Sequence, residues 1–278
     1  MVLRCKVGPR IGCANNWPYA YFLGKSFLTA QCAAEIESQS DLPIGSQNGT
    51  LRHSKDPWIW TGHMTYSPPQ KTTMSHNVPA MILAGGRGLR LGSRDKALCR
   101  LGTQTLLEHG LDRLCAHGTP VALNANGDVS RFSKFDVQVV PDSLDGHLGP
   151  LAGILAAMDW AASLGYMDVI TIAVDTPFFP KNLMQRLSKE RAANTIALAA
   201  TRDPQGQLWH HPIFGIWPTN LRDQLRADVL NGARKVTAWT KTQKAGHVVF
   251  DTGDFDPFFN INTPEDLQQA QLFLNRRA

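Results

Sequence analysis

The sequence contains no apolar run of about eighteen residues, the shortest length that usually crosses a membrane. Its most apolar stretch, Leu151–Leu164, is interrupted by Asp159. We therefore expect neither a transmembrane helix nor a membrane partner. Of the 278 residues, 43% are hydrophobic and only 18% are charged, which is typical of a globular protein and excludes a wholly disordered or collagen-like chain.

Paired cysteines and blocks of like charge are also missing. The five cysteines show no CxxC spacing, so we expect neither a zinc site nor a disulfide framework, but reduced thiols in a cytoplasmic protein. The 28 basic residues exceed the 23 acidic ones by 5, and this excess is spread along the chain. Such a balance suits a small polyanionic ligand and does not predict binding to nucleic acid.

Residues 1–77 lack the regular apolar spacing of the rest of the chain. A signal peptide is not expected there, because the short apolar run after Tyr19 is broken by Lys25. We expect this extension to be disordered, without packed structure. Our interpretation is that the true start is Met74, or else Met81, while a genuine extra binding segment is the alternative. The predicted domain covers residues 78–278.

From residue 78 onward, short apolar runs alternate with helical patterns. Strands that are apolar throughout and alternate with helices are typical of a parallel sheet covered by helices on both faces, so the predicted class is α/β with a mostly parallel sheet. The predicted strands are 80–84, 121–123, 137–140, 169–174, 196–200 and 212–217, and the predicted helices are 105–117, 150–164, 181–192 and one capped by Thr263.

The segment after the first strand is rich in glycine and in cations. Residues 83–96 hold four glycines and four basic residues, and glycines let backbone amides approach a phosphate whose charge Arg and Lys neutralise. We interpret the segment as a phosphate-binding loop, with an ordinary glycine-rich turn as the alternative. GxxxxGK[ST] is absent, and Leu91 replaces the third glycine of GxGxxG, which argues against hydride transfer.

Three further strand ends carry polar side chains, and ligands of open parallel sheets bind at such ends. Asn124 follows the second strand, Asp142 the third and Asp175 the fourth. We expect both aspartates to project into one crevice. Asp175 has no evident protein partner in the sequence, so a divalent cation would offset its charge and bridge phosphate oxygens. The alternatives are a plain turn at Asn124 and a helix N-cap at Asp175.

Several short strings together closely resemble the molybdenum cofactor guanylyltransferases, a family of Mg-dependent nucleotidyltransferases. Each string is unspecific, but their order and spacing are similar to that family from Val78 to the last predicted helix. Leu91 departs from it by standing where Met is usual, and residues 1–73 have no counterpart. The strings are Leu83–Gly86, Arg90–Gly92, Asp95-Lys96, Asn124, Pro141–Ser143, Gly149–Gly153, Asp175–Pro177, His211-Pro212, Gly232–Arg234 and Phe259–Asp266.

The resemblance implies a single Rossmann-like nucleotidyltransferase domain. It also implies a reaction in which GMP passes from GTP to the terminal phosphate of molybdenum-molybdopterin and pyrophosphate is released. Mg²⁺ is the implied cofactor, GTP and molybdenum-molybdopterin are the implied substrates, and molybdoenzyme-specific chaperones are further partners in the cytoplasm.

Roles for single residues follow from the same resemblance. Lys96, Asp142 and Asp175 would be catalytic, and Asp175 would hold the metal. GTP would be bound by Leu83, Ala84, Gly85, Gly86, Arg90, Lys96, Asn124, Asp142 and Asp175. The candidates for the pterin side are Arg234, Asn260 and Asn262, for which a solvated helix position and a satisfied turn are the alternatives.

Three rival functions stay open on the sequence alone. Molybdopterin cytidylyltransferases tend to carry Leu-Ala-Ala-Gly in the loop and to lack the Gly149–Gly153 string. Gly85 stands where they carry Ala, and the missing methyl group leaves room for the larger purine base. A sugar-1-phosphate nucleotidyltransferase would need a longer acceptor part. A nucleotide-binding accessory protein without catalysis would need the loop but not Lys96 and both aspartates.

Overall fold

The computed structural model describes residues 78–276, except 86–94, 147, 194 and 204. All described residues lie in one compact unit. The expectation for residues 1–77 falls outside them, as do Gly86 and Arg90 of the predicted phosphate loop. Among the described helices, none is both long and apolar enough to cross a membrane.

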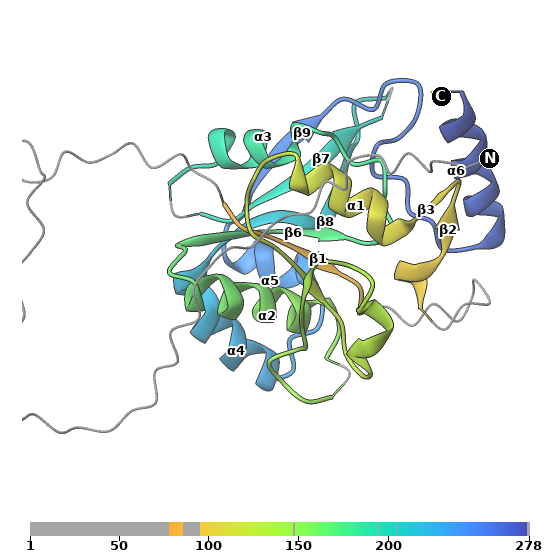
Figure 1. The fold of residues 1–278 in the computed structure, drawn as a ribbon. Coiled ribbons are helices and arrows are strands. Elements are labelled where there is room, and N and C mark those ends of the chain that lie inside the picture. Colours follow the sequence, from red (N-terminus) through yellow and green to blue (C-terminus); the bar gives the residue numbers. More distant parts are fainter. Residues whose placement is uncertain (1–77, 86–94, 147, 194, 204, 277–278) are drawn as a thin grey trace, which may run out of the picture. The chain divides into compact units, whose positions relative to one another are not determined.

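Within the described residues, seven strands form one sheet in the order β5-β4-β1-β6-β8-β7-β9 (Figure 1). Strands β5, β4, β1 and β6 run parallel to one another, as do β7 and β9, while β8 runs antiparallel to both β6 and β7. The predicted mostly parallel sheet is confirmed, with one reversed strand. The bounds are β1 Ala80–Leu83, β4 Val121–Asn124, β5 Gln138–Val140, β6 Asp168–Ala173, β7 Ala197–Arg202, β8 Leu208–Pro218 and β9 Gly246–Phe250.

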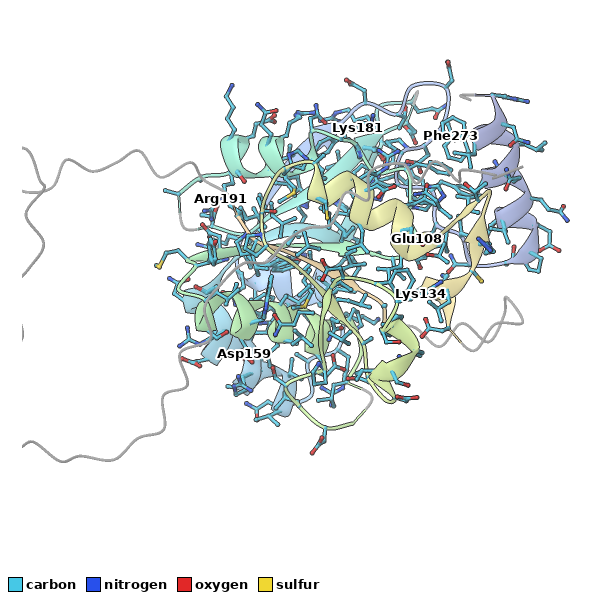
Figure 2. All side chains as sticks on the ribbon, viewed as in Figure 1. Glu108, Lys134, Asp159, Lys181, Arg191 and Phe273 are labelled. Atoms are coloured by element: carbon cyan, nitrogen blue, oxygen red, sulfur yellow. The ribbon has the colours of Figure 1, made fainter. Side chains whose placement is uncertain are left out.

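Helices cover both faces of this sheet, as expected for strands that are apolar on both sides. Figure 1 shows α1 and α3 on one face and α2, α4 and α5 on the other. Figure 2 places Glu108 of α1 and Asp159 of α2 on these two sides. The bounds are α1 Leu106–Cys115, α2 Pro150–Ser163, α3 Leu183–Glu190, α4 Arg222–Leu230, α5 Val236–Thr242 and α6 Pro264–Asn275, with short 3₁₀ helices η2 Lys96–Leu98, η3 Val129–Phe132 and η4 Thr219–Leu221.

Alternate residues of the central strands point into two different cores. Ile82 of β1 packs with Ile172 of β6 on the α1 and α3 side, whereas Met81 packs with Val169 on the α2 side. Strands β1 and β6 therefore lie at the sheet centre with a buried apolar core on each face, and these cores hold them in place. The ends of these two strands therefore form a fixed platform for side chains that follow them.

A third apolar cluster joins the last helix to the rest of the domain. Helix α6 lies beside the small hairpin of β2 (Arg100–Leu101) and β3 (Gln104–Thr105) (Figure 1). Buried Leu101 and Ile261 belong to this cluster. Thr263 caps α6 through a reciprocal capping box with Asp266, which confirms the predicted helix start.

Some elements were not foreseen from the sequence. Helix α5 has only seven residues and β9 only five, so neither repeats an apolar pattern often enough to stand out. Strand β8 begins four residues before the predicted run, at Leu208. Among the described residues, Cys99 is a free thiol.

Candidate active site

The ends of four parallel strands meet at one edge of the sheet and carry the predicted site residues. Leu83 ends β1 and Asn124 ends β4, while Asp142 and Asp175 follow β5 and β6 within two residues of their ends. Strand β1 lies between β4 and β6, so its end at Leu83 lies between Asn124 and Asp142 on one side and Asp175 on the other. The strand order thus spreads the residues along the edge.

The first polar group, which we call the lysine cluster, consists of Lys96, Asp175 and Asn262. The Lys96 Nζ donates to Asp175 Oδ2 at 2.7 Å and to Asn262 Oδ1 at 2.6 Å. The Lys96 side chain is 11% exposed and that of Asp175 is 23% exposed, so the ion pair is largely screened from water. The expectation that Asp175 has no protein partner was therefore wrong, because chain spacing does not reveal a contact over 79 residues.

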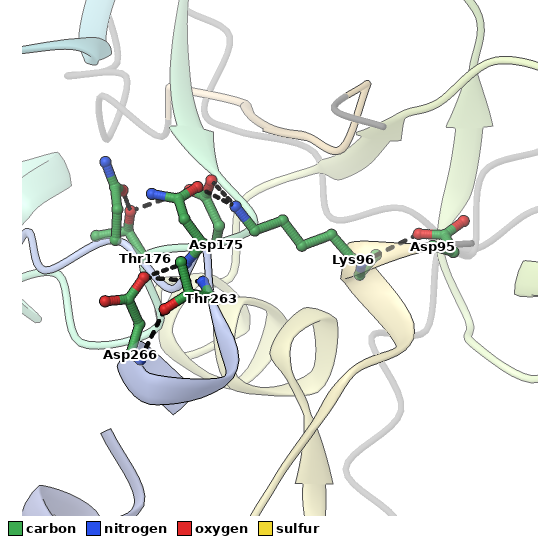
Figure 3. Close-up of polar contacts among 9 residues, drawn as sticks. Asp95, Lys96, Asp175, Thr176, Thr263 and Asp266 are labelled. Carbon is green, nitrogen blue, oxygen red and sulfur yellow. Dashed lines mark hydrogen bonds and ion pairs between the residues drawn. The ribbon is translucent and has the colours of Figure 1, made fainter. Parts of the chain in front are cut away.

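Local structure aims Lys96 at Asp175 (Figure 3). Asp95 is the N-cap of η2, and its Oδ1 accepts a hydrogen bond from the Ala97 amide at 3.0 Å. Its other oxygen accepts from Arg131 Nε at 2.5 Å. As a result, η2 begins at Lys96. The Lys96 side chain then extends across the carboxyl edge of the sheet to the end of β6.

A second set of contacts ties the segment before α6 to the same strand end. The Ile261 amide donates to the Asp175 carbonyl at 2.9 Å, and Ile261 is fully buried. The buried Thr176 hydroxyl bonds Asn260 Oδ1 and lies 3.2 Å from Asp175 Oδ1. Asn260 and Asn262 thus join the lysine cluster, although the sequence resemblance placed them on the pterin side.

The second polar group, the asparagine cluster, consists of Asn124, Asn126 and Asp142. The Asn124 Nδ2 donates to Asp142 Oδ1 at 2.9 Å and to the Val140 carbonyl at 3.1 Å. The Asn126 Nδ2 donates to Asp142 Oδ2 at 2.8 Å. Asn124 is 2% exposed and acts as a support for the half-buried Asp142, so it is not a plain turn residue.

Helix α2 packs directly on Asn124. A Cβ added to Gly153 would lie 2.6 Å from Asn124 Oδ1 and 3.4 Å from Leu83 Cδ2, which is too close for any residue but glycine. Leu151 and Ala152 are buried in the core beside it. The Gly149–Gly153 string therefore allows the helix to approach the site, and its last glycine leaves room for the Asn124 amide.

The two aspartates follow strands that are not neighbours in the sheet. Strands β5 and β6 are three steps apart in the sheet, which at roughly 4.8 Å per step is about 14 Å. That Asp142 and Asp175 project into one crevice stays a prediction, and such a crevice would have to span β4 and β1, which lie between β5 and β6.

Arg234 lies apart from both clusters. It is exposed in the turn between α4 and α5, and its Nη1 donates to the carbonyls of Val229 at 2.6 Å and Ala233 at 2.7 Å. Arg234 is solvated, as the alternative expected, but it follows α4 and its side chain bonds the carbonyls at the end of that helix. A Cβ added to Gly149 would lie 3.6 Å from the Arg234 carbonyl, so this turn borders the start of α2.

His211, from the His-Pro string, packs against the segment that carries the two asparagines. Its ring stacks on Phe258 with centroids 4.0 Å apart, and its Nε2 lies 3.0 Å from Thr201 Oγ1. Burial lowers the pKa of His211 to about 4, against an upward effect of Asp256 and a further downward effect of His210. The imidazole is therefore neutral at neutral pH.

Two residues of the site were missed by sequence reasoning about function. Thr176 sits between Asp175 and Pro177, and a lone threonine gives no signal of its contact with Asn260. Asp95 was noted only as part of a string, although an Asp before a short helical turn is a recognisable N-cap. The alternative that Asp175 is a helix N-cap was wrong, because Asn182 is the N-cap of α3, the next helix.

Comparison with known proteins gives a consistent family. The model of the MobA-like NTP transferase domain matches residues 80–247. A molybdenum cofactor guanylyltransferase of Bradyrhizobium sp. (strain ORS 278) is 43% identical over 199 residues, covering 70% of this chain and 92% of that relative. The chain belongs to the molybdenum cofactor guanylyltransferases. A guanylyltransferase of Rhizobium meliloti (strain 1021) is similar at 42% identity over 205 residues, covering 70% and 91% of the two chains.

Solved structures support the guanylyltransferase fold. Molybdopterin-guanine dinucleotide biosynthesis protein A from Archaeoglobus fulgidus has a TM-score of 0.55 at 22% identity, over 72% of this chain and all of that one (100%). A nucleotidyl transferase from Methanothermobacter thermautotrophicus has a TM-score of 0.57 at 17% identity, over 73% and 100% of the two chains. At these identities the likeness shows the fold alone.

These findings confirm the predicted family, fold class and enzyme class. The protein is a nucleotidyltransferase that uses GTP for guanylyl transfer in molybdenum cofactor biosynthesis. The family also implies GTP and a molybdopterin as substrates.

Proposed function

We propose that this guanylyltransferase binds Mg-GTP along the carboxyl edge of the sheet, with the triphosphate at the lysine cluster and the guanosine towards the asparagine cluster. The observation that carries the proposal is the order of side chains along this edge. Asp142 and Asn124 lie at one end of this edge, and Lys96 with Asp175 lies at the other end. Gly85 follows β1, the strand that lies between them. An extended anionic ligand fits a line better than a single pocket does.

Gly85 is suited to lie beneath the nucleotide. It is exposed and follows β1 directly, and among the described residues an added Cβ would meet Asn124 Oδ1 alone, at 3.9 Å. The absence of a side chain leaves the space above this strand end to the ligand. We propose that Leu83, Ala84 and Gly85, together with Gly86 and Arg90, form the floor and the phosphate loop for GTP.

The lysine cluster fits a magnesium ion whose remaining ligands are supplied by the substrate. Among the described residues, no three His, Cys, Asp or Glu side chains gather to hold a metal ion by themselves. Mg²⁺ is commonly bound through one or two carboxylates together with substrate phosphates, and Asp175 offers one partly exposed carboxylate beside amide oxygens. We propose Asp175 as its protein ligand, with Asp142 acting on the nucleotide.

In the proposed reaction a terminal phosphate oxygen of molybdenum-molybdopterin attacks the α-phosphorus of GTP. A new phosphorus–oxygen bond forms, the bond to the β-phosphate oxygen breaks, and pyrophosphate leaves with the electron pair. When bound, Mg²⁺ would neutralise phosphate charge during this step. Lys96 holds a fixed positive charge at the same place, and Asn260 and Asn262 lie beside it for the second substrate, so the chain mainly positions two anions and stabilises charge.

Arg234 is proposed as a further contact to the pterin, since its turn borders the start of α2 at the site edge. We also propose that the enzyme works in the cytoplasm, where GTP is available, and that molybdoenzyme-specific chaperones receive the product. Cell fractionation tests the location, and co-purification with such a chaperone tests the transfer.

The test of the proposed function is pyrophosphate release by the purified protein supplied with molybdenum-molybdopterin and either Mg-GTP or Mg-CTP. The expected kcat/KM for GTP exceeds that for CTP by at least about tenfold, which corresponds to roughly 1.4 kcal/mol in the transition state. Omission of the pterin or of Mg²⁺ should abolish release. Equal or faster turnover of CTP would contradict the assignment of the base.

A further inference from the structure

Arg131 of η3 donates hydrogen bonds from all three nitrogens of its guanidinium group. The Arg131 Nε donates to Asp95 Oδ2 at 2.5 Å, and its Nη2 donates to the Asn126 carbonyl at 2.8 Å. The Nη1 donates to the Asp128 carbonyl. The guanidinium also lies over the ring of Phe132, 4.4 Å from its centroid, and Phe132 is buried. Two carbonyls and one ring therefore fix the group that holds Asp95.

Asp95 connects Arg131 to the start of η2. The Asp95 Oδ1 accepts from the Ala97 amide at 3.0 Å and caps η2, so Lys96 is the first helical residue. The side chain of Asp95 is 13% exposed and that of Arg131 is 28% exposed, so water screens this ion pair only in part. A hydrogen bond between two charged groups is roughly twice as strong as one between neutral groups. The position of the cap therefore depends on Arg131.

The Lys96 side chain depends on this cap, because it leaves η2 at the first helical residue. Figure 3 shows it extending from the side of Asp95 to Asp175. Its Nζ has two acceptors, Asp175 Oδ2 at 2.7 Å and Asn262 Oδ1 at 2.6 Å. A displacement of η2 would move the ammonium group away from both acceptors. In an active site, a misplacement of about 1 Å can lower the rate by about 10²-fold.

We propose that Arg131 is a positioning residue of the guanylyltransferase, which acts through Asp95 to hold Lys96 in place for the triphosphate. The proposal rests on the proposed function, in which Lys96 binds the triphosphate of GTP. The role requires the planar fork of a guanidinium group. A lysine at this position would carry one nitrogen, which cannot reach the Asp95 carboxylate and two carbonyls in three different directions.

The test measures the Kd for Mg-GTP by isothermal titration calorimetry, without a pterin and therefore without turnover. Arg131→Lys keeps the positive charge and loses the fork, so Kd should rise about fivefold, and kcat/KM in the complete reaction should fall about tenfold or more. Arg191→Lys is the matched control. Arg191 also pairs with an aspartate, Asp168, and donates to the Thr195 carbonyl at 3.3 Å, but Asp168 begins β6, at the opposite end of that strand from the site. Both variants should melt slightly earlier, and the control should keep the wild-type Kd.

The same titration in a Lys96→Met background distinguishes positioning of Lys96 from a merely structural role. Lys96→Met alone should weaken Mg-GTP binding at least about tenfold, because a hydrogen bond to a charged group is lost. Addition of Arg131→Lys should then change Kd by less than about twofold, since the side chain that Arg131 positions is gone. A residue needed only for packing would weaken binding equally in both backgrounds, and that result would overturn the proposal.

Asp95→Asn tests the same connection from its other end, and serves if Arg131→Lys fails to fold. Asparagine is as good an N-cap as aspartate, but its NH₂ group would face the Arg131 donor and cannot accept from it. The Kd for Mg-GTP should rise as in Arg131→Lys, and the double variant should bind no more weakly than either single variant.

The result for Lys96→Met separates this proposal from the proposed function. Weaker Mg-GTP binding in Lys96→Met combined with a wild-type Kd in folded Arg131→Lys or Asp95→Asn would reject the positioning role and keep Lys96 at the triphosphate. A wild-type Kd in Lys96→Met would reject the placement of the triphosphate at the lysine cluster, and the positioning role with it.

Discussion

At the scale of single residues, the site depends on what Gly85 and Asn124 leave open between them. The Asn124 amide is engaged with Asp142 and Val140, so it is fixed before any ligand arrives. Gly85 adds no side chain to this surface. We propose that the space above Gly85 sets the selectivity for the base, so a single methyl group there should affect nucleotide binding and not protein stability.

The variant Gly85→Ala tests this directly. The added Cβ would lie 3.9 Å from its nearest neighbour in the described part of the chain, so the melting temperature should not change. We expect kcat/KM for GTP to fall at least about tenfold relative to that for CTP, because the larger purine loses its space. Gly246→Ala is the matched control, since its added Cβ also meets one atom at 3.9 Å but lies on β9. An unchanged ratio would contradict this role of Gly85.

His211 predicts a pH dependence of stability. Burial lowers its pKa to about 4 from the ordinary value of 6.5, so unfolding takes up a proton between these two pH values. The free energy of unfolding should therefore decrease as the pH falls from 6.5 towards 4, and His211 should contribute no slope above 6.5. Nearby His210 and His247 remain as background, and the pKa of His247 is also lowered by burial.

Urea unfolding at about pH 7.5 and pH 5 measures this slope. His211→Gln keeps a polar side chain near Thr201 and should show a smaller loss of stability at the lower pH than the wild type. The interpretation fails if His211→Gln loses as much stability on acidification as the wild type.

At the scale of elements, α2 packs on the asparagine cluster, and the segment before α6 supplies side chains to the lysine cluster. The apolar runs of β1, β4 and β6 predicted the platform, and the Thr-Pro start predicted α6, because both signals are local. The contact of Lys96 with Asp175 spans 79 residues and that of Thr176 with Asn260 spans 84, so no local pattern contains them. Residue types at strand ends indicated the chemistry, whereas their pairing needed the strand order.

Gly153→Ala tests the support that α2 gives to Asn124. The new Cβ would lie 2.6 Å from Asn124 Oδ1, so the amide must move and its bond to Asp142 must weaken. We expect KM for GTP to rise several-fold and stability to change by only about 1 kcal/mol, since alanine also favours the helix. Gly110→Ala on α1 is the control, because its Cβ would meet Ile82 at a tolerable 3.4 Å. Equal KM values in both variants would contradict the account.

At the scale of the whole molecule, the two clusters, the sheet edge and α6 all lie within residues 78–276. The family model also matches within this range, at residues 80–247. We propose that residues 78–278 form the complete catalytic domain, and that the preceding segment takes no part in guanylyl transfer.

A chain that begins at Met74 should therefore fold and work like the full chain. The expected result is the same melting temperature, within about 2 °C, and the same kcat and KM for GTP. Loss of solubility or of activity would show that residues 1–73 contribute to the function. The N-terminal sequence of the native protein, determined by Edman degradation, would show directly whether these residues are made.

We propose that catalysis depends on the negative charge of Asp175, and steady-state pyrophosphate release by Asp175→Asn measures this dependence. Asp159→Asn is a matched control, because both aspartates accept a charged donor at 2.7 Å and have side chains 23% and 26% exposed. Each variant should lower the melting temperature slightly, as each loses an ion pair. We predict that Asp175→Asn loses at least about 10²-fold in kcat, roughly 3 kcal/mol, and that Asp159→Asn keeps its rate. Near wild-type turnover by a folded Asp175→Asn variant would contradict the account.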